Sequence, residues 1–155
     1  MARQAGRRSA SAASEPAGSE LDPASYEALA GFRYELRKFM AFSKRAAEGA
    51  GLKPQQYQAL LAVKAHAGPE AISPKELAET LFIGLSTAVE LVDRLESSGL
   101  VRREPSARDR RRTLLLLTPK AERALASLAA VHRDELREQV PALISLLSRI
   151  QGQAD

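Results

Sequence analysis

The sequence predicts a mainly α-helical fold with one small β-hairpin, and three observations lead to this prediction. Apolar residues recur every three or four positions over most of the chain after residue 25, which is the period of amphipathic helices. Between residues 100 and 117 the period changes to two, which is typical of paired strands. The chain has 155 residues, of which 45% are hydrophobic, and this is enough to bury the core of one domain.

The composition excludes several classes of protein. Because the chain has no cysteine, it has no disulfide, no thiolate metal site and no thiol redox switch, and its two histidines leave little for a zinc site. We therefore expect no metal and no cofactor. No apolar run reaches the roughly 18 residues of a membrane span, and the N-terminus lacks the apolar core of a signal peptide. These absences predict a soluble, cytoplasmic protein.

Residues 1–23 are predicted to form a disordered tail. They are mostly small and polar, so they cannot bury enough apolar surface to offset the entropy lost on ordering. The arginines Arg3, Arg7 and Arg8 are offset by three acidic residues in the same segment, which favours a solvated tail over a contact to a phosphate backbone.

The next segment is predicted to contain two helices. The first, residues 24–48, is amphipathic and ends near Gly49. Pro54 opens the second helix, in the first turn, where its missing N–H costs nothing, and Gly68 and Pro69 end it. The apolar stripe of the first helix consists of Leu29, Phe32, Leu36, Phe39 and Met40.

The third and fourth helices are predicted to form a helix-turn-helix. The third, residues 73–82, begins at the capping box formed by Ser73 and Glu76. The fourth, residues 86–97, is predicted to begin with Ser86 as its N-cap. A turn of three or four residues between them is the spacing that lets the second helix enter a major groove of DNA.

A basic β-hairpin is predicted directly after these helices. Its strands are residues 100–104 and 112–117, and a charged loop joins them. Residues 100–113 hold six arginines against Glu104 and Asp109, so this segment carries the whole net charge of +4. Guanidinium groups suit a narrow minor groove of DNA, although a solvated charged loop is the alternative. The predicted fold is therefore a winged helix-turn-helix.

The C-terminal region is predicted to contribute to a homodimer. A fifth helix covers residues 119–139, Pro141 is predicted to break it, and a last helix covers residues 142–151. With the first helix, these dimerisation helices flank the winged helix-turn-helix and carry more apolar surface than it covers. The alternative is a monomer in which they pack on each other. The predicted interface residues are Leu29, Phe32, Leu36, Leu136, Leu143, Leu146, Leu147 and Ile150.

Three stretches together resemble the MarR family of bacterial transcription regulators. They are Leu-Val-Asp-Arg-Leu-Glu-Ser-Ser-Gly-Leu-Val at 91–101, Asp-Arg-Arg at 109–111 and Leu-Thr-Pro at 117–119, and the resemblance extends over about residues 26–150. It implies a triangular homodimer that presents two winged helix-turn-helix units to a palindromic operator, as a ligand-responsive repressor. It also implies that Arg111 enters the minor groove and that Asp109 orients it.

The predicted DNA contacts lie on the third helix, the fourth helix and the hairpin. Glu90 departs from the family pattern, and it either reads a cytosine amino group or lies off the contact surface, four residues before its ion-pair partner Arg94. Phe82 stands where the turn residue is often glycine, and Gly84-Leu85 replaces more polar residues. These features favour the alternative of a winged-helix module that binds an acidic protein. The predicted contacts are Ser73, Lys75, Ser86, Thr87, Glu90, Arg94, Arg108, Asp109, Arg110, Arg111 and Arg112.

The resemblance implies an effector pocket between the dimerisation helices and the winged helix-turn-helix, and an enzyme is not expected. Relatives in the family often bind small aromatic or anionic molecules there, although aromatic side chains on helices are more often core. His132, Asp134 and Glu135 come nearest to a catalytic set, but they are interpreted as a solvated helix face without a nucleophile. The predicted pocket residues are Phe39, Phe42, Tyr57 and His66.

Overall fold

The computed structural model describes residues 21–152, which form five helices and a two-stranded antiparallel sheet. The predicted fold class, mainly helical with one hairpin, is confirmed. The predicted tail lies outside the described residues up to residue 20, and Asp22 then caps the first helix by accepting the Ser25 N–H. In chain order the elements are α1 (Pro23–Gly49), α2 (Pro54–Ala65), α3 (Pro74–Leu81), α4 (Leu85–Ser97), β1 (Val101–Pro105), β2 (Thr113–Leu117) and α5 (Pro119–Gln151).

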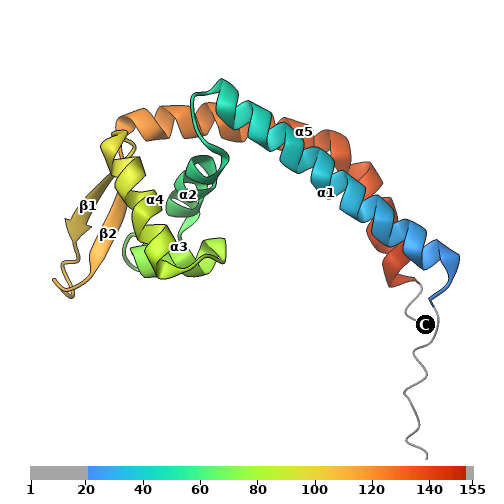
Figure 1. Ribbon diagram of the computed structural model, residues 1–155, viewed down its shortest axis with the longest axis horizontal. Helices are drawn as coiled ribbons and strands as arrows, with labels where there is room; N and C mark the ends of the chain where they lie inside the picture. The colour runs from blue at the N-terminus through green and yellow to red at the C-terminus, as the bar shows by residue number, and fades with distance from the viewer. Residues whose placement is uncertain (1–20, 153–155) are drawn as a thin grey trace, which may run out of the picture.

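The chain has two parts (Figure 1). Helices α2, α3 and α4 and the β1–β2 hairpin gather into one unit, residues 54–117, which we call the winged body. Helices α1 and α5 lie side by side as a long arm that extends away from it. They run antiparallel, because Ser43 contacts His132 near one end of the arm and Glu27 pairs with Arg149 near the other. Within residues 21–152 no helix is long and apolar enough to cross a membrane.

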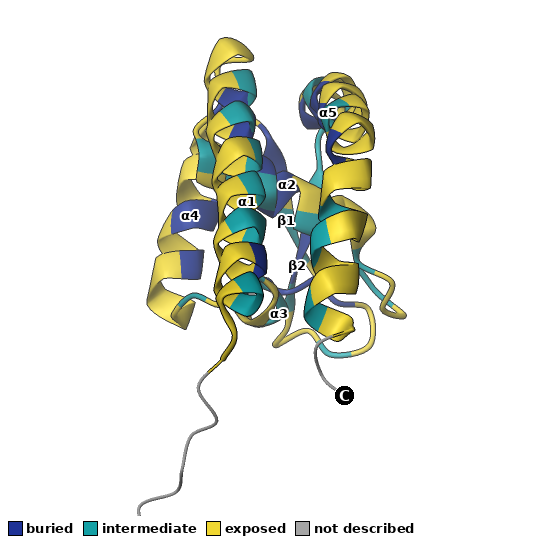
Figure 2. Cartoon of the chain, turned by 90° about the vertical axis from the view of Figure 1, so that its right-hand side faces the viewer, coloured by how far each residue is buried: buried dark blue, intermediate teal, exposed yellow. Residues whose placement is uncertain are grey.

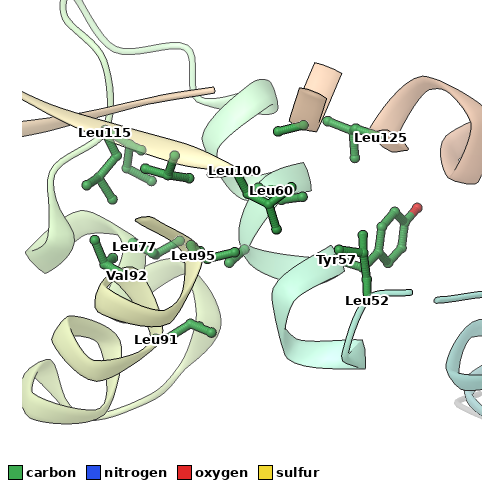
Figure 3. Close-up of a cluster of buried hydrophobic side chains, with 14 of the residues drawn as sticks. Leu52, Tyr57, Leu60, Leu77, Leu91, Val92, Leu95, Leu100, Leu115 and Leu125 are labelled. Carbon is green, nitrogen blue, oxygen red and sulfur yellow. The ribbon is translucent and has the colours of Figure 1, made fainter. Parts of the chain in front are cut away.

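The core of the winged body is largely aliphatic, with Tyr57 at one end, and holds α4 against the hairpin (Figure 3). Burying a leucine side chain contributes about 1.5–3 kcal/mol, so several leucines from different elements fix these elements relative to each other. The start of α5 closes one side of this core. The buried leucines of the core include Leu60 of α2, Leu77 of α3, Leu91 and Leu95 of α4, Leu115 of β2 and Leu125 of α5.

The hairpin is the predicted one with small shifts of its ends. The pairing runs from Val101 opposite Leu117 to Pro105 opposite Thr113. The N–H of Leu115 donates to the carbonyl of Ile72 at 2.8 Å, so the segment before α3 is bonded to β2. The wing is thereby tied to the helix-turn-helix through the backbone as well as through the core.

The starts of α3 and α4 differ from each other. The capping box at Ser73 and Glu76 is confirmed: the Ser73 Oγ accepts from the Glu76 N–H, and the Glu76 carboxylate accepts from the Ser73 N–H. The prediction that Ser86 caps α4 is wrong: the helix begins at Leu85 and its N-cap is Gly84, which makes no side-chain bond. The N-cap lies at Gly84, two residues before Ser86, so the Ser86 side chain stands in the first turn of the helix and does not cap it.

The turn between α3 and α4 contains a strained aromatic residue. Phe82 has φ 54° and ψ 42°, which is the left-handed conformation, and its side chain is 96% exposed. The Ile83 N–H donates to the Ala78 carbonyl, which closes the turn. A left-handed residue with a side chain costs about 1–2 kcal/mol. The turn of the helix-turn-helix therefore carries a strained Phe82 at a position where glycine would fit without strain.

The predicted break at Pro141 is wrong. Helix α5 runs without interruption from Pro119 to Gln151, with Pro141 inside it. Proline removes one helical hydrogen bond and crowds the preceding turn, but it need not end a helix that is packed along its length. Here α1 packs along α5 on both sides of the proline, through Ser43 at His132 and through Gly31 at Leu146. The two predicted C-terminal helices are thus one long arm helix.

Candidate nucleic-acid interface

Helix α4 presents a polar face away from the core. Its apolar side, with Ala88 and Leu91, is buried, whereas Ser86 and Thr87 are exposed. Within the described part of the chain, neither hydroxyl makes a hydrogen bond, and the cap at Gly84 leaves the first N–H groups of the helix without a side-chain acceptor. Free hydroxyl and N–H groups at a helix start suit phosphates and base edges.

Glu90 and Arg94 form the predicted ion pair on the same helix. Their charged atoms are 3.8 Å apart and both side chains are well exposed. An exposed pair of this kind contributes little to stability. It places a negative charge one turn beyond Ser86 and Thr87 and a positive charge two turns beyond them.

At the tip of the wing, Asp109 holds Arg111. The Oδ1 atom of Asp109 accepts from the Arg111 backbone N–H at 3.0 Å and from its Nε–H at 3.1 Å. The side-chain bond from Arg111, followed by the backbone bond, lowers the pKa of Asp109. The Arg111 side chain nevertheless remains 91% exposed. The contact anticipated from the sequence is present, and it fixes a guanidinium group that projects into solvent.

Most of the other wing arginines are paired with acids, several of them from outside the hairpin. Arg102 pairs with Glu104, and Arg112 pairs with Glu76 of α3 at 3.2 Å. Arg103 binds Asp93 and Glu96 of α4, and the Asp93 bond is the largest cause of its raised pKa. The charge excess of the isolated segment is therefore partly neutralised by α3 and α4. Among the residues described, the wing arginines without an ion pair are Arg108 and Arg110.

The two predicted contacts at the start of α3 differ in availability. Ser73 is buried, and its hydroxyl donates to the Glu76 carboxylate at 2.8 Å as part of the cap. Lys75 is exposed and makes no ion pair within the described chain. Lys75 is thus free to meet a phosphate, whereas the Ser73 side chain is engaged inside the protein.

Ser106 anchors the wing loop, and sequence reasoning missed it. It is 1% exposed, and its hydroxyl donates to the Glu70 carboxylate, with Oγ at 2.7 and 2.8 Å from the two oxygens. The same Oγ accepts from the N–H groups of Arg108 and Asp109, each at 3.1 Å. A small polar residue three positions before an Asp is a weak turn signal, and nothing in the sequence pairs it with Glu70, which lies in the loop before α3.

We expect Ser106→Ala to loosen the wing loop. Two part-buried N–H groups would lose their acceptor, which costs about 1–3 kcal/mol in the free energy of unfolding. Urea unfolding measures this cost, and hydrogen exchange should be faster at Arg108 and Asp109. The matched control is Ser97→Ala, because the Ser97 hydroxyl is exposed and donates only to its own helix at Asp93. Equal stability of the two variants would contradict the anchoring role.

Glu76 makes the contact between the wing and α3 dependent on pH. The backbone N–H of Ser73 is the main cause that lowers the pKa of Glu76 from its ordinary value of 4.5; the Ser73 hydroxyl and Arg112 add to it, against desolvation. A carboxylate with a lowered folded-state pKa stabilises the fold above its unfolded-state pKa, and this contribution is lost as pH falls through the folded-state value.

We therefore expect the wild type to unfold at higher urea than Glu76→Gln at about pH 6, with the difference closing as pH falls below about 4.5. The comparison between the two proteins cancels the titration of the other carboxylates. A difference that stays constant over this pH range would show that the ionised carboxylate is not what stabilises this contact.

Three of the four predicted pocket residues gather around His132. The Tyr57 ring stacks on the His132 ring with 4.4 Å between the ring centroids. Phe39 and Phe42 approach the His132 ring edge-on, with centroid distances of 6.0 and 5.5 Å. His66 is not part of this cluster; it lies at the end of α2. Burial raises the pKa of Tyr57. A neighbouring groove of about 460 Å³ is lined by Phe42 and by residues of α1 and α5.

His132 itself contradicts the interpretation of a solvated face. It is buried, with Nδ1 2.7 Å from the Leu128 carbonyl and Nε2 2.9 Å from the Ser43 hydroxyl. Asp134 is exposed and is directed elsewhere, toward arginines of its own helix. His132 follows the buried Leu125 and Leu128 at steps of three and four residues, and this helical period indicates its burial better than the neighbouring charged residues do. Within residues 21–152 no group of three or more His, Asp or Glu side chains lies close enough to hold a metal ion.

Residues 50–112 match the family model described as MarR family. The match contains α2, the helix-turn-helix and the first part of the wing. Over a longer stretch of 129 residues, the chain is 30% identical to the putative transcriptional regulatory protein for the hcr operon of Thauera aromatica. The alignment covers 78% of this chain and 76% of that protein. The chain belongs to the MarR family.

Solved MarR-family structures share this fold. AbsC of Streptomyces coelicolor has a TM-score of 0.66 at 22% identity, with 82% of this chain and 83% of AbsC covered. The S. aureus MepR–DNA complex has a TM-score of 0.59 at 21% identity and 70% and 82% coverage. CouR from Rhodococcus jostii RHA1, bound to p-coumaroyl-CoA, has a TM-score of 0.59 at 26% identity and 66% and 71% coverage.

Membership of the MarR family defines the general function of the chain. It is a DNA-binding transcriptional regulator, and the family is not one of enzymes. The winged body contains a helix-turn-helix with free polar groups at the start of α4 and a wing whose loop carries the exposed Arg111.

Proposed function

We propose that this MarR-family protein is a homodimeric repressor that binds a palindromic operator and leaves it when a small molecule binds. The observation that carries the proposal is the exposed Arg111 guanidinium, which Asp109 holds on a wing packed beside α4. In this proposal α4 enters the major groove with Ser86 and Thr87, and Arg111 enters the adjacent minor groove. Lys75, Arg108 and Arg110 meet phosphates, since they make no ion pair in the described chain.

The dimer is supported by the apolar surface of the arm. Figure 2 shows exposed residues along α1 and α5, and many of them are large and apolar. Many exposed large apolar side chains on two packed helices favour a protein–protein interface on the arm. Of the predicted interface residues, Phe32, Leu143, Leu146 and Ile150 are partly covered by the packing of α1 on α5. The others, Leu29, Leu36, Leu136 and Leu147, are exposed.

A second copy that covers these side chains would pair two winged bodies. A two-fold dimer reads two half-sites related by the same symmetry, about one helical turn or 10 bp apart. The MepR–DNA complex is an example of this fold on DNA. Ser73 and Arg112 have smaller roles in this proposal than in the sequence-based prediction, because Glu76 engages both.

The proposed effector site is the groove of about 460 Å³ beside the His132 cluster. Its lining is largely apolar, with Phe42 and Val131 on opposite helices, so it suits the aromatic part of a ligand. It lies between the two helices of the arm, where a bound molecule would alter how the arm joins the winged body. CouR is solved with p-coumaroyl-CoA, which is a precedent for an aromatic, anionic ligand on this fold.

Selection from a random-sequence duplex pool by the full-length protein, with competitor DNA at physiological salt, tests the proposal. We expect enrichment of a palindrome whose half-sites are about 10 bp apart. No enrichment would contradict it, and would favour the module that binds an acidic protein. Exposed Phe82 and Leu85 beside Glu90 are the features that speak for that second candidate.

A further inference from the structure

An apolar patch lies at the start of the recognition helix. It consists of Phe82 in the turn, Leu85 in the first turn of α4 and Val89 one turn later. Their side chains are 96%, 54% and 39% exposed, respectively. Leu85 and Val89 are four residues apart and therefore share one side of the helix. None of the three belongs to the core of the winged body.

Folding of the chain does not explain this patch. Phe82 has the left-handed conformation that favours glycine, and within residues 21–152 almost nothing covers its ring. Leu85 lies at the first helical position, next to Ser86 and Thr87, where a polar residue would serve the fold equally well. Phe82 is strained and adds almost nothing to the packing of the isolated subunit, and Leu85 is half exposed, so both side chains are available to contact a partner.

Polar groups and charges of both signs lie beside the apolar patch. Leu85 lines a hollow of about 640 Å³ with Lys75, Arg112, Glu76 and Glu79; Arg112 is paired with Glu76, whereas Lys75 makes no ion pair within residues 21–152. The exposed Ser86 and Thr87 follow Leu85 on α4. A partner that fits Lys75, these hydroxyls and the apolar patch together combines a negatively charged outer surface with apolar groups inside a groove. The major groove of DNA has this combination, because each thymine carries a C5-methyl group between the phosphate chains.

We propose that the apolar patch reads thymine methyl groups in the operator. This inference rests on the proposed function, since it requires α4 to enter the major groove. Under this proposal, residues that make no hydrogen bonds contribute to the choice of DNA sequence. Each half-site of the operator is expected to contain thymines opposite α4. Gly84-Leu85 also has a role, because an apolar first turn contacts methyl groups where a polar one would contact base edges.

Replacement of thymine by deoxyuridine in the selected duplex tests this directly, because it removes the methyl group alone. We expect the wild type to lose affinity about fourfold for each contacted thymine, the equivalent of one buried methyl group. Leu85→Ala should bind the thymine duplex about tenfold more weakly and should lose almost nothing further on the deoxyuridine duplex. The control Leu61→Ala, an exposed leucine of α2, should behave as the wild type on both duplexes.

Phe82→Gly separates recognition from folding. Glycine relieves the left-handed strain, so we expect the melting temperature to rise by about 3–6 °C while affinity for the thymine duplex falls. Equal affinity of the wild type for both duplexes would overturn the inference and leave the proposed function standing. The apolar patch would then contact another protein or a second copy of the chain instead of thymine. Absence of any duplex binding would instead overturn the proposed function itself.

Discussion

Arg111→Ala is expected to weaken operator binding about tenfold to a hundredfold, or about 1–3 kcal/mol. The guanidinium is 91% exposed and held by Asp109, so its removal takes away a positioned charge without disturbing the core. A lost minor-groove or phosphate contact also removes the release of about one counterion. The slope of log affinity against log salt concentration should therefore decrease in magnitude by about 1. Fluorescence anisotropy over a salt series measures both quantities.

Arg45→Ala is the matched control for this experiment. Arg45 is an exposed arginine of α1 on the arm and makes no ion pair within the described residues. The two variants change the net charge equally, so a general effect of charge would affect both. If Arg111→Ala bound as tightly as Arg45→Ala with the same salt slope, the wing would have no part in DNA binding.

Leu36→Glu is expected to separate the dimer and, with it, to abolish tight operator binding. Leu36 lies on α1 in the proposed interface and is 41% exposed in the single subunit. A two-fold dimer would bury two unpaired carboxylates, one from each subunit, at a cost of about 3–5 kcal/mol for a buried charge without a partner. The dissociation constant of the dimer should rise by about a hundredfold or more. Analytical ultracentrifugation at micromolar concentration measures it.

Leu61→Glu provides the control, since Leu61 has the same 41% exposure but lies on α2 in the winged body. It should remain a dimer and bind the operator as the wild type does. A wild type that sediments as a single 16.8 kDa chain at micromolar concentration would support the alternative in which the arm helices serve only one subunit. A dimeric Leu36→Glu variant would show that the interface lies elsewhere.

The helix-turn-helix was predictable because its signals are local. The capping box at Ser73 and Glu76, proline at the starts of α2 and α3 and the change to period two after Gly99 each involve residues within a few positions. The Asp109–Arg111 contact has the same character, since it spans two residues. Such short-range preferences need no knowledge of the rest of the chain.

The features that escaped prediction depend on distant contacts. Pro141 remains within α5 because α1 packs along both sides of it, and Ser106 is ordered by Glu70, 36 residues earlier. The charge of the wing is likewise reduced by acids of α3 and α4 that pair with Arg112 and Arg103. A count of charges along the sequence cannot find such partners. It located the basic segment but overestimated how much of its charge is free.

The central claim is that two copies of this chain bind one duplex through the start of α4 and the wing. Sedimentation of a fluorescent duplex with two half-sites about 10 bp apart tests it most directly, with saturating full-length protein at low and at high salt. At low salt we expect the mass of the complex to exceed the mass of the free duplex by twice the 16.8 kDa of one chain. The complex should dissociate as salt rises. One chain per duplex, or a complex indifferent to salt, would contradict the claim.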